Sequence, residues 1–351
     1  MRHFCSNWET CLDFHSPLRE IRFNCQALPG AILWRNDMKK ILLALAATTM
    51  MASSAYAADK IGVSMAKFDD NFLTVLRNGI EAQSTAMGAE VQIEDAQNDV
   101  AKQLDQIKNF AASGVQAIIV NPVDTSATQA MSDAAAAANI PLVYVNRQPI
   151  NIDTLPDNQA FVASNEVDSG TLETIEICRL LKEAGKAEAN VYIMMGELSN
   201  QAAVQRTKDI HDVMADGRCV VKLNIIDEQT ANWSREEATN LMTNWISSGK
   251  PYDAVIANND EMAIGAIQAM KAAGVDMKTM FVGGVDATQD ALASMQAGDL
   301  DATVFQNAAG QGAGSLDAAI KLAKGEAVEQ KVWIPFELVT PANIGDYLKK
   351  N

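Results

Sequence analysis

The sequence predicts an α/β fold made of two parallel sheets, each flanked by helices. From about residue 58 onward, short apolar runs alternate with helical patterns of about 10–15 residues, which is typical of βαβ units. The strand-like runs are too many for one doubly wound sheet, so we expect two sheets of about five or six strands. We expect strands at residues 60–65, 90–95, 116–120, 141–145, 160–164, 190–195, 219–226, 253–258, 279–285, 301–306 and 331–338.

The helical segments between these runs show apolar residues at the spacing of one helix face. In residues 72–87, this face is formed by Phe72, Leu76 and Ile80. Further helices are expected at residues 100–112, 125–138, 201–214, 234–247 and about 309–324.

The βα units fall into two runs. Residues 59–164 form the first and residues 165–306 the second, whereas the stretch from residue 307 could return to either. No Pro- or Gly-rich linker separates the runs. We therefore expect short crossings between the two domains, and no flexible tether.

Residues 38–57 have the pattern of a secretory signal peptide. A basic start (MKK, 38–40) precedes an apolar run that is too short to span a membrane, and AYA (55–57) is an A-x-A cleavage site. The alternative is a buried helix. Because a signal peptide begins a chain, we interpret residues 1–37 as a non-native leader, although an unusual N-terminal extension is the alternative. The mature protein is then expected to begin at Ala58 and to be periplasmic.

The charge and the cysteines limit the function classes. The net charge is −16, and without residues 1–57 the chain has 22 basic and 40 acidic residues, which argues against nucleic acid as a partner. Outside that segment the cysteines are Cys178 and Cys219, which form either a disulfide or two buried thiols. No C-x-x-C or Cys/His cluster suggests zinc, and we expect neither a metal nor a cofactor.

An enzyme is the weaker hypothesis. The sequence lacks G-x-G-x-x-G, a P-loop and a G-x-S-x-G nucleophile elbow. Beyond residue 57 the histidine is His211, so a Ser-His-Asp or Cys-His site is improbable. Adjacent carboxylates such as Asp69 and Asp70 more often cap a helix than perform acid–base chemistry.

Polar side chains follow seven of the apolar runs at the point where each run ends. Ligands of open parallel sheets bind beyond the carboxyl ends of the strands, so these side chains are expected around one crevice. Amides, carboxylates and a guanidinium suit an uncharged, polyhydroxylated ligand. The strand-end residues include Lys67, Asp70, Asn121, Asn146, Arg147, Asn259, Asp286 and Gln306.

Some of these residues have an ordinary structural interpretation. Asp70 would cap the helix at residues 72–87, and Asn121 would form a turn because Pro122 follows it. We interpret Asp260 as a helix cap and assign the ligand role to Asn259. For Arg147 a purely structural role is harder to argue, because a guanidinium fork at a crevice suits the vicinal hydroxyls of a ligand.

Three further residues could either bind the ligand or have an ordinary structural role. Arg206 lies in the predicted helix 201–214, where a solvated arginine is the usual case. Phe72 and Trp233 offer aromatic faces for the C–H bonds of a sugar. Their alternatives are core packing for Phe72 and a hydrophobic staple for Trp233.

Six motifs in order resemble the type I periplasmic sugar-binding proteins of the ribose/galactose-binding group, the solute receptors of ABC importers. They are MAKFDDNFL (65–73), VNPVD (120–124), NRQ (146–148), NNDEMA (258–263), GGVDA (283–287) and ATVFQ (302–306). The resemblance extends from Ala58 to the C-terminus and implies two Rossmann-like domains joined by a three-segment hinge, with the ligand between them. It implies lobes of residues 58–164 with about 307–335, and 165–306 with about 336–351. The binding residues implied by motif are Asp70, Phe72, Asn121, Asn146, Arg147, Arg206, Trp233, Asn259, Asp286 and Gln306.

Departures from the ribose-binding pattern bear on the ligand. Ribose binders usually carry Asp where this chain has Asn146, and Phe where it has Trp233, and Lys67 adds a charge at the mouth of the crevice. Residues 68–74 and 194–206 look more like the myo-inositol binders of the group. We therefore expect a monomeric receptor for myo-inositol that delivers it to a membrane permease. The alternatives are a ribose- or galactose-type receptor and, less favoured, a secreted carbohydrate-acting enzyme.

Overall fold

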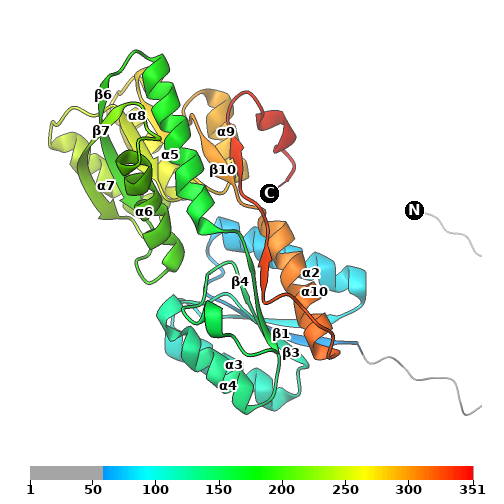
Figure 1. Cartoon of the computed structure of the whole chain (residues 1–351). Helices are drawn as coiled ribbons and strands as arrows, with labels where there is room; N and C mark the ends of the chain where they lie inside the picture. Colours follow the sequence, from blue (N-terminus) through cyan, green and yellow to red (C-terminus); the bar gives the residue numbers. More distant parts are fainter. Residues whose placement is uncertain (1–57, 351) are drawn as a thin grey trace, which may run out of the picture. The chain divides into compact units, whose positions relative to one another are not determined.

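The computed structural model describes residues 58–350, which form parallel sheets covered by helices (Figure 1). The first sheet has six parallel strands in the order β11-β5-β4-β3-β1-β2. Its central strands are buried on both faces, as expected for a parallel sheet. The strands are β1 (Lys60–Met65), β2 (Glu90–Asp95), β3 (Ala117–Val120), β4 (Leu142–Val145), β5 (Gln159–Ala163) and β11 (Lys331–Trp333).

Four helices cover this sheet: α2 (Asn71–Met87), α3 (Val100–Ser113), α4 (Thr128–Ala137) and α10 (Ala308–Ala323). Helices α2 and α10 pack on one face, and α3 and α4 contribute to a separate core on the other. Helices α2 and α10 approach closely because Gly312 has no side chain, and a Cβ there would lie 2.2 Å from the Leu76 carbonyl oxygen. We call the first sheet with these helices the first lobe.

The second lobe contains a four-stranded parallel sheet in the order β7-β6-β8-β9 and the antiparallel pair β10-β12. Single bridges, Gly283 to Ala302 and Asp286 to Phe305, connect the two sheets. The strands are β6 (Glu188–Met195), β7 (Lys222–Thr230), β8 (Ala254–Ala257), β9 (Phe281–Gly283), β10 (Thr303–Phe305) and β12 (Glu337–Val339). The helices are α5 (Glu166–Glu183), α6 (Gln201–Ala215), α7 (Arg235–Ser247), α8 (Asp260–Ala272) and α9 (Gln289–Ala297).

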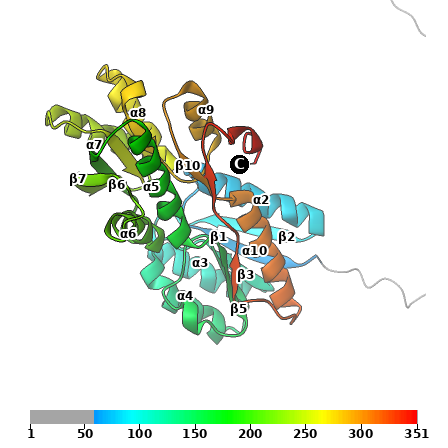
Figure 2. The same cartoon turned by 45° about the horizontal axis from the view of Figure 1, so that its top comes forward.

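The chain passes between the lobes at three places, which lie between β5 and α5, between β10 and α10, and between β11 and β12 (Figure 2). The single strand predicted at residues 331–338 is therefore wrong. It is two short strands, one in each lobe, separated by a segment that contains Pro335, which has no N–H for a ladder.

Other elements differ in detail from the prediction. The helix expected at residues 125–138 begins as a 3₁₀ turn, Thr125–Ala127, before α4. Similar short turns are Ile152–Thr154, Met277–Thr279 and Ile344–Asp346. None of the helices within residues 58–350 has the length and apolar character needed to cross a membrane. The expected leader and signal peptide lie outside the described residues.

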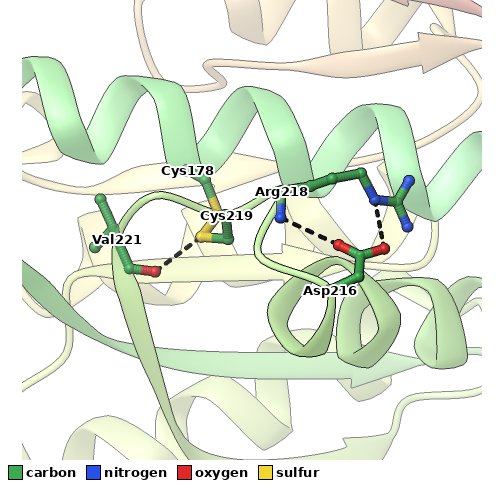
Figure 3. Close-up of a disulfide and its surroundings, with 5 residues drawn as sticks. All are labelled: Cys178, Asp216, Arg218, Cys219 and Val221. Atoms are coloured by element: carbon green, nitrogen blue, oxygen red, sulfur yellow. Dashed lines mark hydrogen bonds and ion pairs between the residues drawn. A yellow bond between two sulfur atoms is a disulfide. The ribbon is translucent and has the colours of Figure 1, made fainter.

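Cys178 and Cys219 form a disulfide, which settles the alternative that the sequence left open. Figure 3 shows the bond joining Cys178 on α5 to Cys219 in the segment between α6 and β7. Beside it, Arg218 donates to Asp216 from both its backbone N–H and its Nε, at 3.1 and 2.7 Å. The disulfide therefore links the segment that follows α6 to α5.

Candidate ligand-binding site

A pocket is lined by residues of both lobes. Its residues come mainly from loops that follow strand ends and from the first turns of helices, as the parallel topology predicts. The lining residues are Asp70, Phe72, Leu73, Asn146 and Arg147 of the first lobe, with Glu166, Asn200, Ala202, Arg206, Trp233, Asn259, Asp286 and Gln306 of the second.

Nine of the predicted binding residues line this pocket, and Lys67 and Asn121 do not. Asn121 is fully buried beneath it, where its side chain donates to Val145 O and Asn146 Oδ1, both at 3.3 Å. Its Oδ1 accepts from Ala66 N at 3.4 Å. Asn121 thus connects three strand ends. Lys67 lies in the adjoining groove, with Nζ 3.8 Å from Asp70 Oδ2.

Asp70 and Phe72 each have a structural contact in addition to their place in the pocket. Asp70 is the N-cap of α2, and its Oδ1 accepts from Leu73 N at 2.9 Å. Phe72 is 8% exposed and belongs to the core under α2. For these residues, the structural interpretation and the position in the pocket are compatible.

Arg147 is held in place by the first lobe. Its Nη1 donates to the carbonyls of Pro122 and Val123 at 3.0 and 3.1 Å, and the residue is 3% exposed. Its Nη2 lies 3.3 Å from Glu197 Oε2 of the second lobe. The preceding residue, Asn146, has φ 66°, a left-handed conformation that asparagine tolerates better than most residues.

Arg206 is not the solvated helix residue that its sequence context favoured. It is 4% exposed, and its Nε and Nη2 donate to the two carboxylate oxygens of Glu166 at 2.7 and 3.2 Å. Nη1 donates to Asn258 O at 2.6 Å, and Nη2 also donates to Gln306 Oε1 at 3.2 Å. The fork is oriented because α5 brings Glu166 beside α6.

Asp286 lies 3.9 Å from Arg206 Nη1, and its backbone φ is 121°. Burial raises the pKa of this carboxyl well above its usual range, against the opposing effect of Arg206. The neighbouring Asp260 also has its pKa raised, to about 7, mainly by burial. A buried carboxyl group, Asp260, therefore lies behind Asp286, the carboxyl group that lines the pocket.

The assignment of Asp260 as a helix cap was wrong. Asn259 is the N-cap of α8, and its side chain accepts from Met262 N at 3.0 Å. Asp260 is fully buried, and its carboxylate accepts from Thr303 Oγ1 at 2.7 Å and from Thr288 N at 2.8 Å. The sequence prediction placed this N-cap one residue too late, because Asn and Asp are both favourable N-cap residues.

Trp233 closes one side of the pocket. It has φ 63°, is 8% exposed and packs against Gly196 at the end of β6. A Cβ at Gly196 would lie 2.1 Å from the indole ring, so the ring can occupy this position only beside a glycine. The centre of the Arg206 guanidinium lies 5.6 Å from the ring centroid.

Sequence reasoning missed four lining residues, which are Leu73, Glu166, Asn200 and Ala202. Asn200 caps α6 by accepting from Ala202 N at 3.1 Å, so its position before a predicted helix was an available clue. Glu166 directly follows the strand-end pair Ser164 and Asn165. Among the described residues, no group of three or more His, Cys, Asp or Glu side chains is arranged to hold a metal ion.

Both lobes contribute hydrogen-bonding groups to the pocket. Carboxylates, amides and guanidinium groups lie together there, with aromatic faces from Phe72 and Trp233. A polyhydroxylated ring can donate to the carboxylates and accept from the amide and guanidinium N–H groups. Residues 61–327 match the model of the periplasmic binding protein domain. The chain belongs to this family.

Individual relatives agree with this assignment. A putative rhizopine-binding protein of Rhizobium meliloti is 62% identical over 315 residues, which cover 90% of this chain and 100% of that protein. An ABC transporter solute binding protein of Bacillus halodurans, solved with bound myo-inositol, is 39% identical. It matches with a TM-score of 0.78 over 85% of this chain and 100% of its own.

A Caulobacter myo-inositol binding protein, solved with myo-inositol, is 28% identical and matches with a TM-score of 0.75. The match covers 84% of this chain and 97% of that one. The chain therefore has the type I periplasmic binding protein fold and is a sugar-binding receptor of the ABC importer family. Members of this family are solute-binding receptors and not enzymes, so the enzyme hypothesis is dropped.

Proposed function

We propose that this protein is a receptor for a cyclitol, with myo-inositol the first candidate, and that it delivers this ligand to the permease of an ABC importer. A ribose- or galactose-type sugar is the second candidate. The observation that carries the proposal is the pocket, in which carboxylate, amide and guanidinium groups from both lobes surround one space. The myo-inositol bound to the Bacillus halodurans and Caulobacter proteins supports the choice of ligand.

The binding residues of this proposal are the nine predicted residues that line the pocket. Arg147, Arg206 and Gln306 provide N–H donors, and Asp70 and Asp286 provide acceptors. Trp233 and Phe72 contact the C–H faces of the ring. Lys67 acts at the rim and Asn121 acts by holding the strand ends together.

The mechanism that we propose is closure of the two lobes on the ligand. Arg147, Arg206 and Asp286 are each less than 5% exposed, so a ring reaches them only when the lobes move apart. The three crossings between the lobes form the hinge, with lobes of residues 58–164 with about 307–335 and 165–306 with about 336–351. A ligand that touches both lobes stabilises the closed state through contacts that the open state lacks.

We further propose that the protein acts as a monomer in the periplasm, after export through the signal peptide at residues 38–57. N-terminal sequencing of the native protein tests the export. A mature chain that begins at Ala58 is expected, and one that retains Cys5, Cys11 and Cys25 contradicts it.

Calorimetric titration with a ligand panel tests the proposed function. The panel contains myo-inositol, other cyclitols, rhizopine, ribose and galactose. We expect tightest binding for a cyclitol, and recovery of the ligand unchanged after incubation. Tighter binding of ribose or galactose would replace the proposed ligand class, and product formation would contradict the receptor function.

A further inference from the structure

Glu197 makes a cluster of contacts between the lobes without lining the ligand pocket. It lies in the segment between β6 and α6, and its side chain is 13% exposed. Its Oε2 lies 3.3 Å from Arg147 Nη2. Its Oε1 accepts from Asn98 Nδ2 at 3.2 Å and lies 3.5 Å from Lys67 Nζ. One carboxylate of the second lobe thus contacts three donors of the first.

These three donors come from three different loops of the first sheet. Lys67 follows β1, Asn98 follows β2 and Arg147 follows β4. They meet because the carboxyl ends of parallel strands lie along one edge of the sheet. Glu197 therefore contacts a surface that is built from three loops of the first lobe.

The cations of this surface are also held within the first lobe. Arg147 donates to the Pro122 and Val123 carbonyls, and Lys67 lies 3.8 Å from Asp70. Separation of the lobes would leave these contacts in place and would remove only Glu197. The carboxylate docks onto a prearranged site, so its loss should change lobe closure more than the orientation of Arg147.

We propose that Glu197 is the closure latch of the receptor. Its carboxylate holds the closed lobes together from outside the pocket, and it thereby sets how long the ligand stays bound. This inference rests on the proposed function, because a latch affects residence time only if ligand binding closes the lobes. Glu197 is a positioning residue, since it acts on the ligand through the lobe that it holds.

Backbone contacts beside Glu197 support this assignment. Thr125 donates from its N–H and from its Oγ1 to the carbonyl of Ser199, both at 3.0 Å. These bonds also cross between the lobes, two residues along from the carboxylate. The segment that carries Glu197 is therefore fixed against the first lobe, which reduces the entropy lost when the ion pairs form.

A second contact between the lobes uses a carboxylate, Glu261, that is also paired within its own lobe. Asn71 Nδ2 donates to Glu261 Oε1 at 2.8 Å. Glu261 also accepts from Arg235 of its own lobe at 2.8 and 2.9 Å. Opening would leave the Glu261 charge paired, whereas Glu197 would lose two cations. Of these two contacts between the lobes, it is therefore the Glu197 cluster whose ion pairs exist only in the closed state.

Stopped-flow binding of myo-inositol to Glu197→Gln tests the latch. We expect the dissociation rate to rise about tenfold or more and the association rate to change little, because a desolvated charge pair acts mainly on dissociation. Glu236→Gln is the matched control, since Glu236 is an exposed carboxylate in the groove outside the pocket and its change removes the same charge. Its dissociation rate should stay near that of the wild type.

A double-mutant cycle tests the same contact from the other lobe. Lys67→Met should raise the dissociation rate, and its combination with Glu197→Gln should raise it less than the two separate effects predict. Lys67 is partly exposed, so this arm remains informative if Glu197→Gln fails to fold. Equal dissociation rates for the wild type, Glu197→Gln and Lys67→Met would overturn the latch. Absence of myo-inositol binding to the wild type would instead contradict the proposed ligand.

Discussion

Asp70, Asn200 and Asn259 each cap a helix and also line the pocket. Their side chains accept from the N–H groups of the first helical turn, which stabilises the helix by about 1 kcal/mol. A substitution at any of these residues would therefore change stability and binding together. Asp286 and Arg147 cap no helix and are better residues for a test of binding, but Arg147 also pairs with Glu197 across the lobes, so Asp286 is the one that tests the pocket without the latch.

Substitution of Asp286 or Arg147 should weaken ligand binding. Asp286→Asn replaces the carboxyl group with an amide, and it is preferable to alanine because asparagine better tolerates a positive φ. Hydrogen bonds to charged groups contribute about 1.5–3 kcal/mol, so each of Asp286→Asn and Arg147→Ala should weaken binding by about tenfold to a hundredfold in calorimetric titration.

The control for this series is Asp105→Asn on α3, where the side chain is 71% exposed. It should bind as the wild type does. Arg147→Ala also leaves the Pro122 and Val123 carbonyls without this donor, so its thermal unfolding should be measured alongside. A folded variant with wild-type affinity would remove that residue from the site.

At the scale of elements, the pair α5 and α6 positions the Arg206 fork. The helices approach closely at Gly170, where a Cβ would lie 2.4 Å from the Arg206 carbonyl oxygen. The disulfide joins the same region, since Cys178 lies on α5 and Cys219 follows α6. The geometry of Glu166 and Arg206 therefore depends on how these two helices pack.

Removal of the disulfide should lower stability and leave binding nearly unchanged. The bond closes a loop with a sequence separation of 41, and constraint of the unfolded chain by such a loop stabilises a protein by about 2–4 kcal/mol. The Cys178→Ser/Cys219→Ser double variant should show this loss in urea unfolding. Addition of reductant should destabilise the wild type and leave the variant unaffected. Equal unfolding midpoints would mean that the bond adds no stability.

Asp209 on α6 should make stability fall as pH rises. It is 1% exposed, its Oδ1 accepts from Gln205 Nε2 at 2.6 Å, and burial raises its pKa to about 7. The folded state therefore holds this proton more tightly than the unfolded state does. Its stabilising contribution is complete below about pH 4 and is lost as pH rises through about 7. Asp260 acts in the same direction, with its pKa also raised to about 7.

Asp209→Asn replaces the titrating carboxyl group with an amide that does not titrate. The pKa rises from 3.8 to about 7, and each pKa unit corresponds to about 1.4 kcal/mol, so the variant should be more stable than the wild type at pH 8 by up to about 4 kcal/mol. The difference should disappear near pH 4. Urea unfolding at both pH values measures it. Asp105→Asn, at an exposed position on α3, is the control and should show no such gain. A constant difference across pH would contradict the titration.

At the scale of the whole protein, the pocket residues are divided between two lobes that three crossings connect. Each lobe has its own cores, so each can move as a body while the crossings bend. Small-angle scattering should show a smaller radius of gyration with saturating myo-inositol than without it. Asp286→Asn at the same ligand concentration should show a smaller decrease. An unchanged radius for a saturated wild type would exclude closure.

The sequence by itself determined the alternation of strands and helices, because apolar periodicity depends on local burial. It also identified most of the pocket, because parallel strands place the residues after them at one edge. Only the tertiary structure decided that Arg206 pairs with Glu166, that Glu197 reaches Arg147, and that Cys178 meets Cys219. It also divided the expected last strand between β11 and β12. These features depend on which distant elements pack together, and no local pattern in the chain encodes that choice.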